Sequence, residues 1–147
     1  MKPFGVVKGI RRRLGVRGET TAARLLEIHG CQILCRNYRC RAGELDLVVL
    51  DGGILLFIEV KTLREKPGFA PAGNLSAAQC RRNFSAAMQY LAMLHYVPAA
   101  WRFDLIEVVF RGRRVASLRR HPDYLPPHGT ETVAEALARR PFWGYII

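Results

Sequence analysis

Residues 43–61 read GELDLVVLDGGILLFIEVK, and this stretch decides the fold. Two runs rich in Val, Ile, Leu and Phe flank an Asp-Gly-Gly sequence at residues 51–53. Glycine readily adopts the positive φ angles that two-residue hairpin loops require, and apolar runs of this length are typical of strands. The stretch therefore predicts two antiparallel strands joined by a tight turn.

Charged side chains are expected to gather on one face of this hairpin. With the two glycines as the loop, Asp46 faces Glu59 across the strands and Glu44 faces Lys61, and residues two apart on a strand share a face. A loop shifted back by one residue makes Asp46 and Glu59 diagonal neighbours that still lie on the same face. The other face is expected to be apolar and to carry Leu45, Leu47, Val49, Ile58 and Val60.

Two carboxylates that face each other destabilise a fold unless a cation or a shared proton relieves their repulsion. Mg²⁺ and Mn²⁺ prefer such oxygen ligands, and Lys61 could contact a water or phosphate held by the metal. The pattern thus indicates phosphodiester chemistry. The alternative is a solvated sheet face on which Lys61 pairs with Glu44 or Glu59 and Asp46 is merely exposed.

Asp46, then twelve residues, then Glu59-Val60-Lys61 resembles the Asp…Glu-x-Lys core of the PD-(D/E)xK nucleases. More narrowly, residues 43–47, 57–62 and 102–105 resemble the bacterial YraN/UPF0102 family, which is similar to archaeal Holliday junction resolvases. The resemblance runs from about residue 19 to residue 124. It implies an α/β fold, a restriction-endonuclease-like sandwich with a mixed central β-sheet flanked by helices.

The resemblance also implies a mechanism. Asp46 and Glu59 would hold Mg²⁺ or Mn²⁺ together with the Val60 carbonyl, and Lys61 would orient or help deprotonate the attacking water. The expected function is metal-dependent endonucleolytic hydrolysis of branched or otherwise structured DNA. Cutting a symmetric junction on two strands would favour a homodimer, by analogy. The alternative is a basic nucleic-acid-binding protein of the same fold that cleaves nothing.

A helix is predicted for residues 19–29, where apolar residues recur at helical spacing and Gly30 provides a stop. Glu19 would then lie in the first turn, where a carboxylate complements the helix dipole. The resemblance offers a second role, because a glutamate at this place approaches the metal in the family. Glu19 is therefore a candidate third acidic ligand.

The net charge of +11 favours nucleic acid as the partner, because a basic chain attracts polyanions before specific contacts form. An anionic membrane surface is the competing partner, but no apolar run approaches the length of a transmembrane helix and no signal-peptide core is present. We therefore expect a cytoplasmic protein. The four cysteines lack C-x-x-C pairs, which disfavours zinc and favours reduced thiols.

Three regions are expected along the chain. Residues 1–18 contain no acid and are predicted to form a basic N-terminal arm, which could lie along phosphates or serve as a flexible tail. Residues 19–124 form the nuclease-like domain. Residues 125–147 form a C-terminal extension, with a short helix predicted at 130–140 and an aromatic tail at 142–147.

Arginines close to the predicted metal site are candidates for phosphate contacts. A strand is predicted for residues 31–36, followed by a basic connector at 37–41. The candidates in this region are Arg36, Arg39 and Arg41.

A second helix is predicted to begin at Ser76, a good N-cap residue, and to end before Pro98. The resembled family usually has a lysine near Gln79, and this chain does not. Arg81 or Arg82 could supply the missing positive charge near the phosphate, so all three are candidates for nucleic-acid contact. The more polar side of the helix is predicted to carry Arg81, Arg82 and Asn83.

Two further strands are predicted, at residues 101–110 and 115–118, with a turn at Gly112. Asp104 lies within the first of them. It is expected to pair with Arg102 or another basic neighbour and to serve a structural role.

Overall fold

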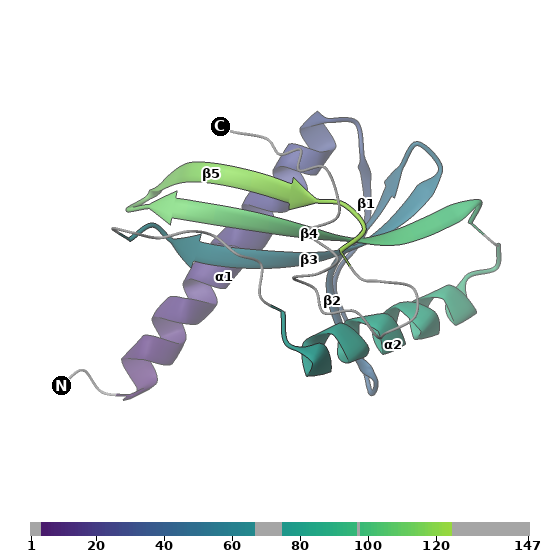
Figure 1. The fold of residues 1–147 in the computed structure, drawn as a ribbon, viewed down its shortest axis with the longest axis horizontal. Coiled ribbons are helices and arrows are strands. Elements are labelled where there is room, and N and C mark those ends of the chain that lie inside the picture. Colours follow the sequence, from purple (N-terminus) through teal and green to yellow (C-terminus); the bar gives the residue numbers. More distant parts are fainter. Residues whose placement is uncertain (1–3, 67–74, 97, 125–147) are drawn as a thin grey trace.

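The computed structural model describes residues 4–66, 75–96 and 98–124, which form a five-stranded sheet and two helices (Figure 1). The elements in chain order are α1 (Phe4–Ile28), β1 (Gln32–Cys40), β2 (Gly43–Asp51), β3 (Ile54–Arg64), α2 (Ala77–Met93), β4 (Ala100–Arg111) and β5 (Arg114–His121).

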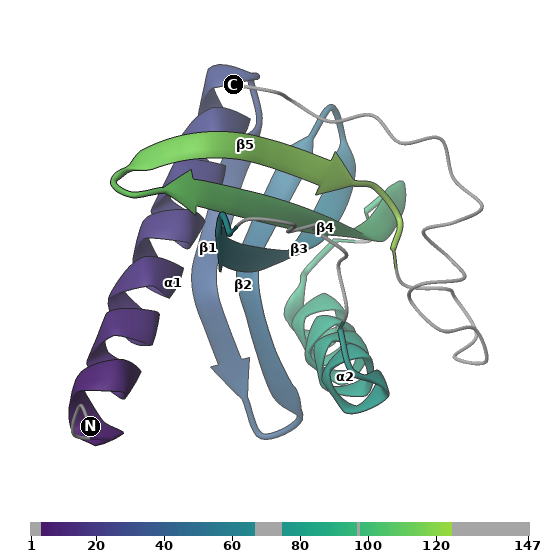
Figure 2. The ribbon, with the colours of Figure 1, turned by 60° about the vertical axis from the view of Figure 1, so that its left-hand side comes forward.

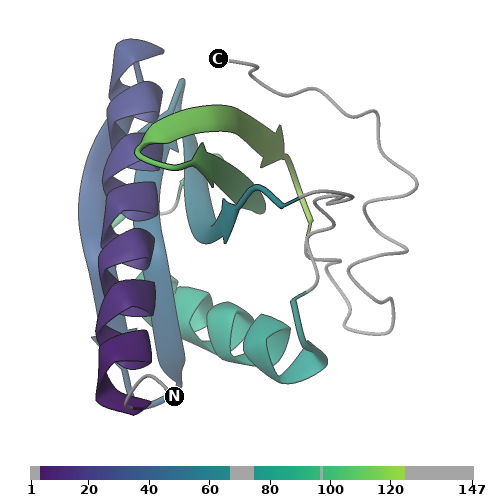
Figure 3. The same cartoon turned by 90° about the vertical axis from the view of Figure 1, so that its left-hand side faces the viewer.

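The sheet is mixed and has the strand order β1-β2-β3-β4-β5. Strand β3 runs parallel to β4, and all other neighbours are antiparallel. Helix α1 covers one face of the sheet and α2 covers the other, as Figures 2 and 3 show. The α/β sandwich with a mixed central sheet is therefore confirmed, and it is consistent with the restriction-endonuclease-like arrangement.

The central hairpin has the predicted loop. Asp51 pairs with Ile54, and the two residues between them, Gly52 and Gly53, have φ angles of 54° and 88°. Residues with a Cβ rarely adopt two successive positive φ angles, so this loop favours glycine.

The two faces of the sheet bury separate apolar clusters. The cluster under α1 includes Leu47 and Ile58, as predicted, whereas Leu45 belongs to the cluster under α2. The prediction for Leu45 was wrong because side chains of β2 do not alternate regularly between the two faces from Leu45 to Leu47. Asn37 of β1, near Leu45 in the register, has a positive φ of 52°.

Helix α1 begins at Phe4 and not at residue 19, so residues 4–18 are helical and are not the flexible tail of the alternative, and their predicted role as a basic arm stays a prediction. No proline interrupts the segment, and its second half is anchored to the sheet. Leu14 packs on the cluster under α1, and the Arg17 guanidinium lies 4.6 Å from the centre of the Phe110 ring. Glu19 consequently lies in the middle of α1, which excludes the predicted role at a helix N-terminus.

The contact between α1 and β3 is close. A Cβ atom built on Gly18 would lie 1.8 Å from Oγ1 of Thr62, so this helix position requires glycine. Dense packing of this kind fixes the position of α1, and with it the position of Glu19, relative to the sheet.

Strand β1 continues to Cys40, so the connector predicted at 37–41 is largely strand. Pairing with β2 as far as Gly43 overrides the local basic composition. Helix α2 begins as predicted, with the Ser76 side chain accepting a hydrogen bond of 3.1 Å from the Gln79 backbone N–H. Strands β4 and β5 confirm the last two predicted strands.

The helix predicted at 130–140 and the aromatic tail predicted at 142–147 lie outside the described residues. All four cysteines are free thiols. Neither helix of the described residues combines the length and the apolar character needed to cross a bilayer.

Candidate active site

Asp46 and Glu59 lie where β2 and β3 separate. The ladder between these strands ends with Leu47 opposite Ile58, so the predicted strand pair of Asp46 and Glu59 does not form. Strand β3 instead pairs with β4 along its whole length. The Val60 N–H donates to Oδ2 of Asp46 at 2.8 Å, so a carboxylate replaces the backbone acceptor that β2 would have supplied.

Glu59 is only 8% exposed and its carboxylate is held by two amides of α2. Gln79 Nε2 donates to Oε1 at 2.5 Å, and Asn83 Nδ2 donates to Oε2 at 3.1 Å. Asn83 also donates to the hydroxyl of the buried Tyr124, at 3.1 Å. Both carboxylate oxygens of Glu59 therefore have a fixed direction.

The two acids resist ionisation together. Burial, followed by the charge of Asp46, raises the pKa of Glu59 to about 8. Burial also raises the pKa of Asp46 to about 6, although the hydrogen bond from the Val60 N–H and one from Glu59 lower it. Near neutral pH, and without a cation, the pair consequently holds one proton between two carboxylates.

Lys61 lies two residues beyond Glu59 on β3, and its charge lowers the pKa of Glu59. It is the register partner of Glu107 on β4. Its predicted position directly opposite Glu44 in the hairpin register is wrong, because the ladder has already ended there. The carboxylate of Glu44 is exposed and lies 3.7 Å from Arg39.

Glu19 approaches the pair from α1, on the side opposite α2. Its charge raises the pKa of Asp46, and its own pKa is raised by burial despite a hydrogen bond from Asn37. Among residues 4–66, 75–96 and 98–124, no three His, Cys, Asp or Glu side chains form a common ligand group. The structure thus brings Asp46 and Glu59 together, and Glu19 as a further ligand stays a prediction.

The predicted phosphate-contacting arginines are all exposed. Arg36 and Arg39 lie on β1, and Arg41 follows at the β1–β2 turn. Arg81 and Arg82 lie on α2, next to Gln79. Their contact with nucleic acid stays a prediction.

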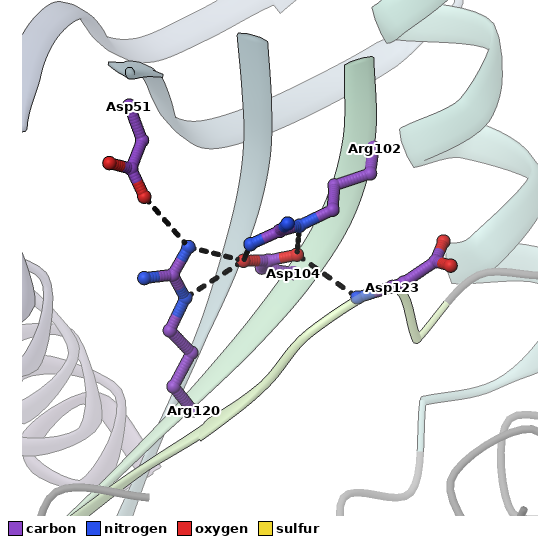
Figure 4. A network of polar contacts seen from close by, with 5 residues as sticks. All are labelled: Asp51, Arg102, Asp104, Arg120 and Asp123. Atoms are coloured by element: carbon purple, nitrogen blue, oxygen red, sulfur yellow. Dashed lines mark hydrogen bonds and ion pairs between the residues drawn. The ribbon is translucent and has the colours of Figure 1, made fainter. Parts of the chain in front are cut away.

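Asp104 forms a polar network with Arg102, Arg120 and the backbone of Asp123 (Figure 4). It is fully buried and accepts hydrogen bonds from Arg102 at 2.8 and 3.1 Å, from Arg120 at 2.8 Å and from the Asp123 N–H at 3.0 Å. Arg120 also lies 3.6 Å from Asp51, so the network ties β5 to the central hairpin. The predicted pairing with Arg102 and the structural role are confirmed.

The sequence reasoning missed Asn83 and Tyr124 at this site. Asn83 is 2% exposed, so its predicted place on the polar side of α2 was wrong. Its spacing of four residues from Gln79, which puts both amides on one helix face, could have identified it. Tyr124 has no comparable local signal, because it reaches Asn83 only through the packing of the chain after β5 on α2.

A mixed sheet between two helices, with a buried acid pair where two central strands part, defines a restriction-endonuclease-like α/β protein. The profile described as "Uncharacterised protein family UPF0102" matches residues 18–108, and the chain belongs to this family.

Relatives with the same family name are similar over most of their length. UPF0102 protein STH1475 of Symbiobacterium thermophilum is 45% identical over 97 residues, which cover 66% of this chain and 82% of the relative. A UPF0102 protein of Geobacter metallireducens is 38% identical over 102 residues, covering 69% and 84%. Another, of Pelotomaculum thermopropionicum, is 45% identical over 101 residues, covering 68% and 83%.

Proposed function

We propose that this protein is a metal-dependent endonuclease that hydrolyses phosphodiester bonds in DNA, with branched or structured DNA as the preferred substrate. The observation that carries the proposal is the buried pair of Asp46 and Glu59. Two neighbouring carboxyl groups that burial makes costly to ionise do not stabilise a fold, and a cation that binds both would explain why they lie together.

The donor set fits Mg²⁺ or Mn²⁺. Both side chains offer oxygen, and Mg²⁺ commonly binds one or two carboxylates while keeping several waters. The ion would be held by Asp46, Glu59 and the Val60 carbonyl. Glu19 lies close enough for its charge to raise the pKa of Asp46. When bound, the ion supplies polarisation of the scissile phosphate and a more acidic water.

The protein's own residues supply orientation and charge. Gln79 and Asn83 fix the direction of the Glu59 oxygens, and such supporting contacts commonly tune a metal site. Lys61 orients the attacking water and offsets negative charge that develops on the phosphate. In the reaction the water oxygen bonds to phosphorus, the bond from phosphorus to the leaving oxygen breaks, and that oxygen takes up a proton.

The alternative is a nucleic-acid-binding protein without catalysis. One observation favours it: the neutral Gln79, and not the lysine usual in the family, donates a hydrogen bond to Oε1 of Glu59. This hydrogen bond uses one of the lone pairs with which Oε1 could bind a metal ion. With a net charge of +11, such a protein would bind DNA in a strongly salt-dependent manner and leave it intact.

Calorimetry tests the proposal, with Mg²⁺ and Mn²⁺ titrated into wild type, Asp46→Asn and Glu59→Gln. Glu27→Gln is the matched control, since it removes the same charge from an exposed position on α1. The same samples are then incubated with branched and linear DNA, and their oligomeric state is measured by sedimentation to check the homodimer expected by analogy.

We expect wild type and Glu27→Gln to bind metal and cleave DNA. We expect Asp46→Asn and Glu59→Gln to lose both metal binding and cleavage. Wild-type protein that takes up no metal and leaves every DNA intact, while binding it, would establish the non-catalytic alternative.

A further inference from the structure

A polar groove of about 590 Å³ lies between α1 and the β1–β2 hairpin. Helix α1 contributes one wall and the hairpin the other. Its lining includes Arg12, Gly15 and Glu19 from α1, and Arg36, Arg39 and Leu47 from the hairpin.

The backbone gives this groove its shape. Arg12, Gly15 and Glu19 are spaced three and four residues apart, so they form one stripe along α1. A Cβ atom built on Gly15 would meet nothing within 4 Å, so the missing side chain leaves open space. On the other wall, the positive φ of Asn37 interrupts the alternation of faces, and arginines three residues apart on β1 both line the groove.

Three arginines and one glutamate give the lining residues an excess of positive charge. Arg36 has a carboxylate of Glu27 at 3.7 Å and Arg39 has one of Glu44 at 3.7 Å, and all four side chains are about half exposed or more. Ion pairs of this length and exposure contribute little stability. A phosphate, which guanidinium groups bind in a bidentate manner, can therefore displace these carboxylates.

The groove reaches the acid pair from the α1 side. Glu19 lines it and its charge acts on Asp46, and the next residue of β2, Leu47, forms part of its lining. The amides of α2 reach Glu59 from the opposite side. A chain of phosphates lying in the groove would therefore lead toward the acids without meeting α2.

We propose that this groove binds the phosphodiester backbone of a single nucleic-acid strand, through Arg12, Arg36 and Arg39. In the proposed nuclease, the phosphates bound in the groove would flank the one that is cleaved. That part rests on the proposed function, whereas the binding itself does not. The groove lies between one helix and one hairpin and has room for one backbone, and basic grooves that follow a single backbone are a common mode of single-strand binding.

Metal-free binding of nucleic acid tests the proposal. Full-length protein in chelator is titrated into a labelled single-stranded oligothymidylate and into a labelled linear duplex, over a series of salt concentrations. The variants are Arg12→Gln and Arg39→Gln, and the matched control is Arg24→Gln, an exposed arginine of α1 outside the groove. Each groove variant should lower the logarithmic salt slope for the single strand by about 0.7, while the control keeps the wild-type slope.

Blocking the groove gives an independent test that preserves every charge. Gly15→Leu places a side chain into the open space beside Gly15, and replacing a helix glycine by leucine favours the helix. The melting temperature should therefore stay the same or rise, while affinity for the single strand falls on the order of tenfold. Gly15→Ala, which adds only a Cβ, is the matched control and should bind as wild type does.

The proposal is overturned if the groove variants keep the wild-type slope, if Gly15→Leu binds as wild type does, or if wild type binds no single strand at low salt. Equal losses for duplex and single strand would overturn the assignment to one strand. These results are separate from the proposed function. If wild type neither binds metal nor cleaves DNA, but the groove variants still bind the single strand more weakly, only the nuclease proposal is refuted. If wild type cleaves DNA and the groove variants bind the single strand as wild type does, only the groove proposal is refuted.

Discussion

Replacing Glu59 by glutamine should make the metal-free protein more stable at alkaline pH. The substitution removes a carboxylate that is 8% exposed and close to Asp46, while keeping an oxygen and the side-chain length. Gln79 can rotate its amide to face the new amide group, so the hydrogen bonding around the position can be retained.

The size of the effect follows from the raised pKa. An acid whose pKa is raised in the folded state contributes its full stability below its unfolded pKa, and that contribution is lost as the pH rises through its folded pKa. For Glu59 the window runs from 4.5 to about 8. Holding this acid in the fold costs about 1 kcal/mol at pH 5 and about 4 kcal/mol at pH 8, a difference of about 3 kcal/mol.

Urea denaturation in chelator measures this difference, for wild type, Glu59→Gln and the exposed control Glu27→Gln, at about pH 5 and pH 8. We expect Glu59→Gln to gain about 3 kcal/mol on wild type between the two pH values, and the control to follow wild type. At pH 8, saturating Mg²⁺ should then close most of the gap, since a ligand at a hundred times its Kd stabilises the binding protein by about 2.7 kcal/mol. A stability gap between wild type and Glu59→Gln that does not change with pH would refute the reasoning.

Three further substitutions test the packing and the support of the site. Asn83→Leu removes the amide that donates a hydrogen bond to Glu59, and it should weaken Mg²⁺ binding on the order of ten- to a hundredfold in calorimetry. Unchanged affinity would show that the amide is dispensable. Asp104→Asn leaves Arg120 buried with less compensation and should cost about 3–5 kcal/mol in urea denaturation; a loss under about 1 kcal/mol contradicts the network. Gly18→Ala should cost about 1–3 kcal/mol because its Cβ would meet Thr62, and stabilisation, the usual effect of alanine in a helix, would contradict the close contact.

The central hairpin could be predicted because its determinants are local. Two glycines with positive φ set the loop, and apolar runs on either side set the register as far as Leu47 opposite Ile58. The end of the ladder could not be predicted in this way. It depends on β4, which is distant in sequence and pairs with β3 along its full length.

The start of α1 was missed for a related reason. Residues 4–18 contain four glycines and a run of arginines, which give a weak helical pattern. The close approach of Gly18 to Thr62, and the contact of Arg17 with Phe110, stabilise this part of the helix only once the sheet exists. Tertiary contacts therefore override local propensity here.

The acids of the site were predictable from spacing, and their environment was not. Asp46 and Glu59 share a face in either of the two hairpin registers considered, so their predicted proximity did not depend on which two residues form the loop. Their burial depends on where α2 packs. The contact is close, because a Cβ atom on Gly43 of β2 would lie 2.3 Å from the Arg82 carbonyl oxygen of α2. No property of the hairpin sequence alone indicates which helix residues reach Glu59.

The hydrogen bond from the Val60 N–H to Asp46 gives this protein an internal spectroscopic probe. The amide proton of Val60 senses the charge of the carboxylate it is bonded to, so its chemical shift should move when Asp46 gains a proton or a cation. In an NMR titration, one assigned backbone signal would then report the occupancy of the acid pair directly. Site binding could be followed in this way without any substrate, and in variants that have lost all activity.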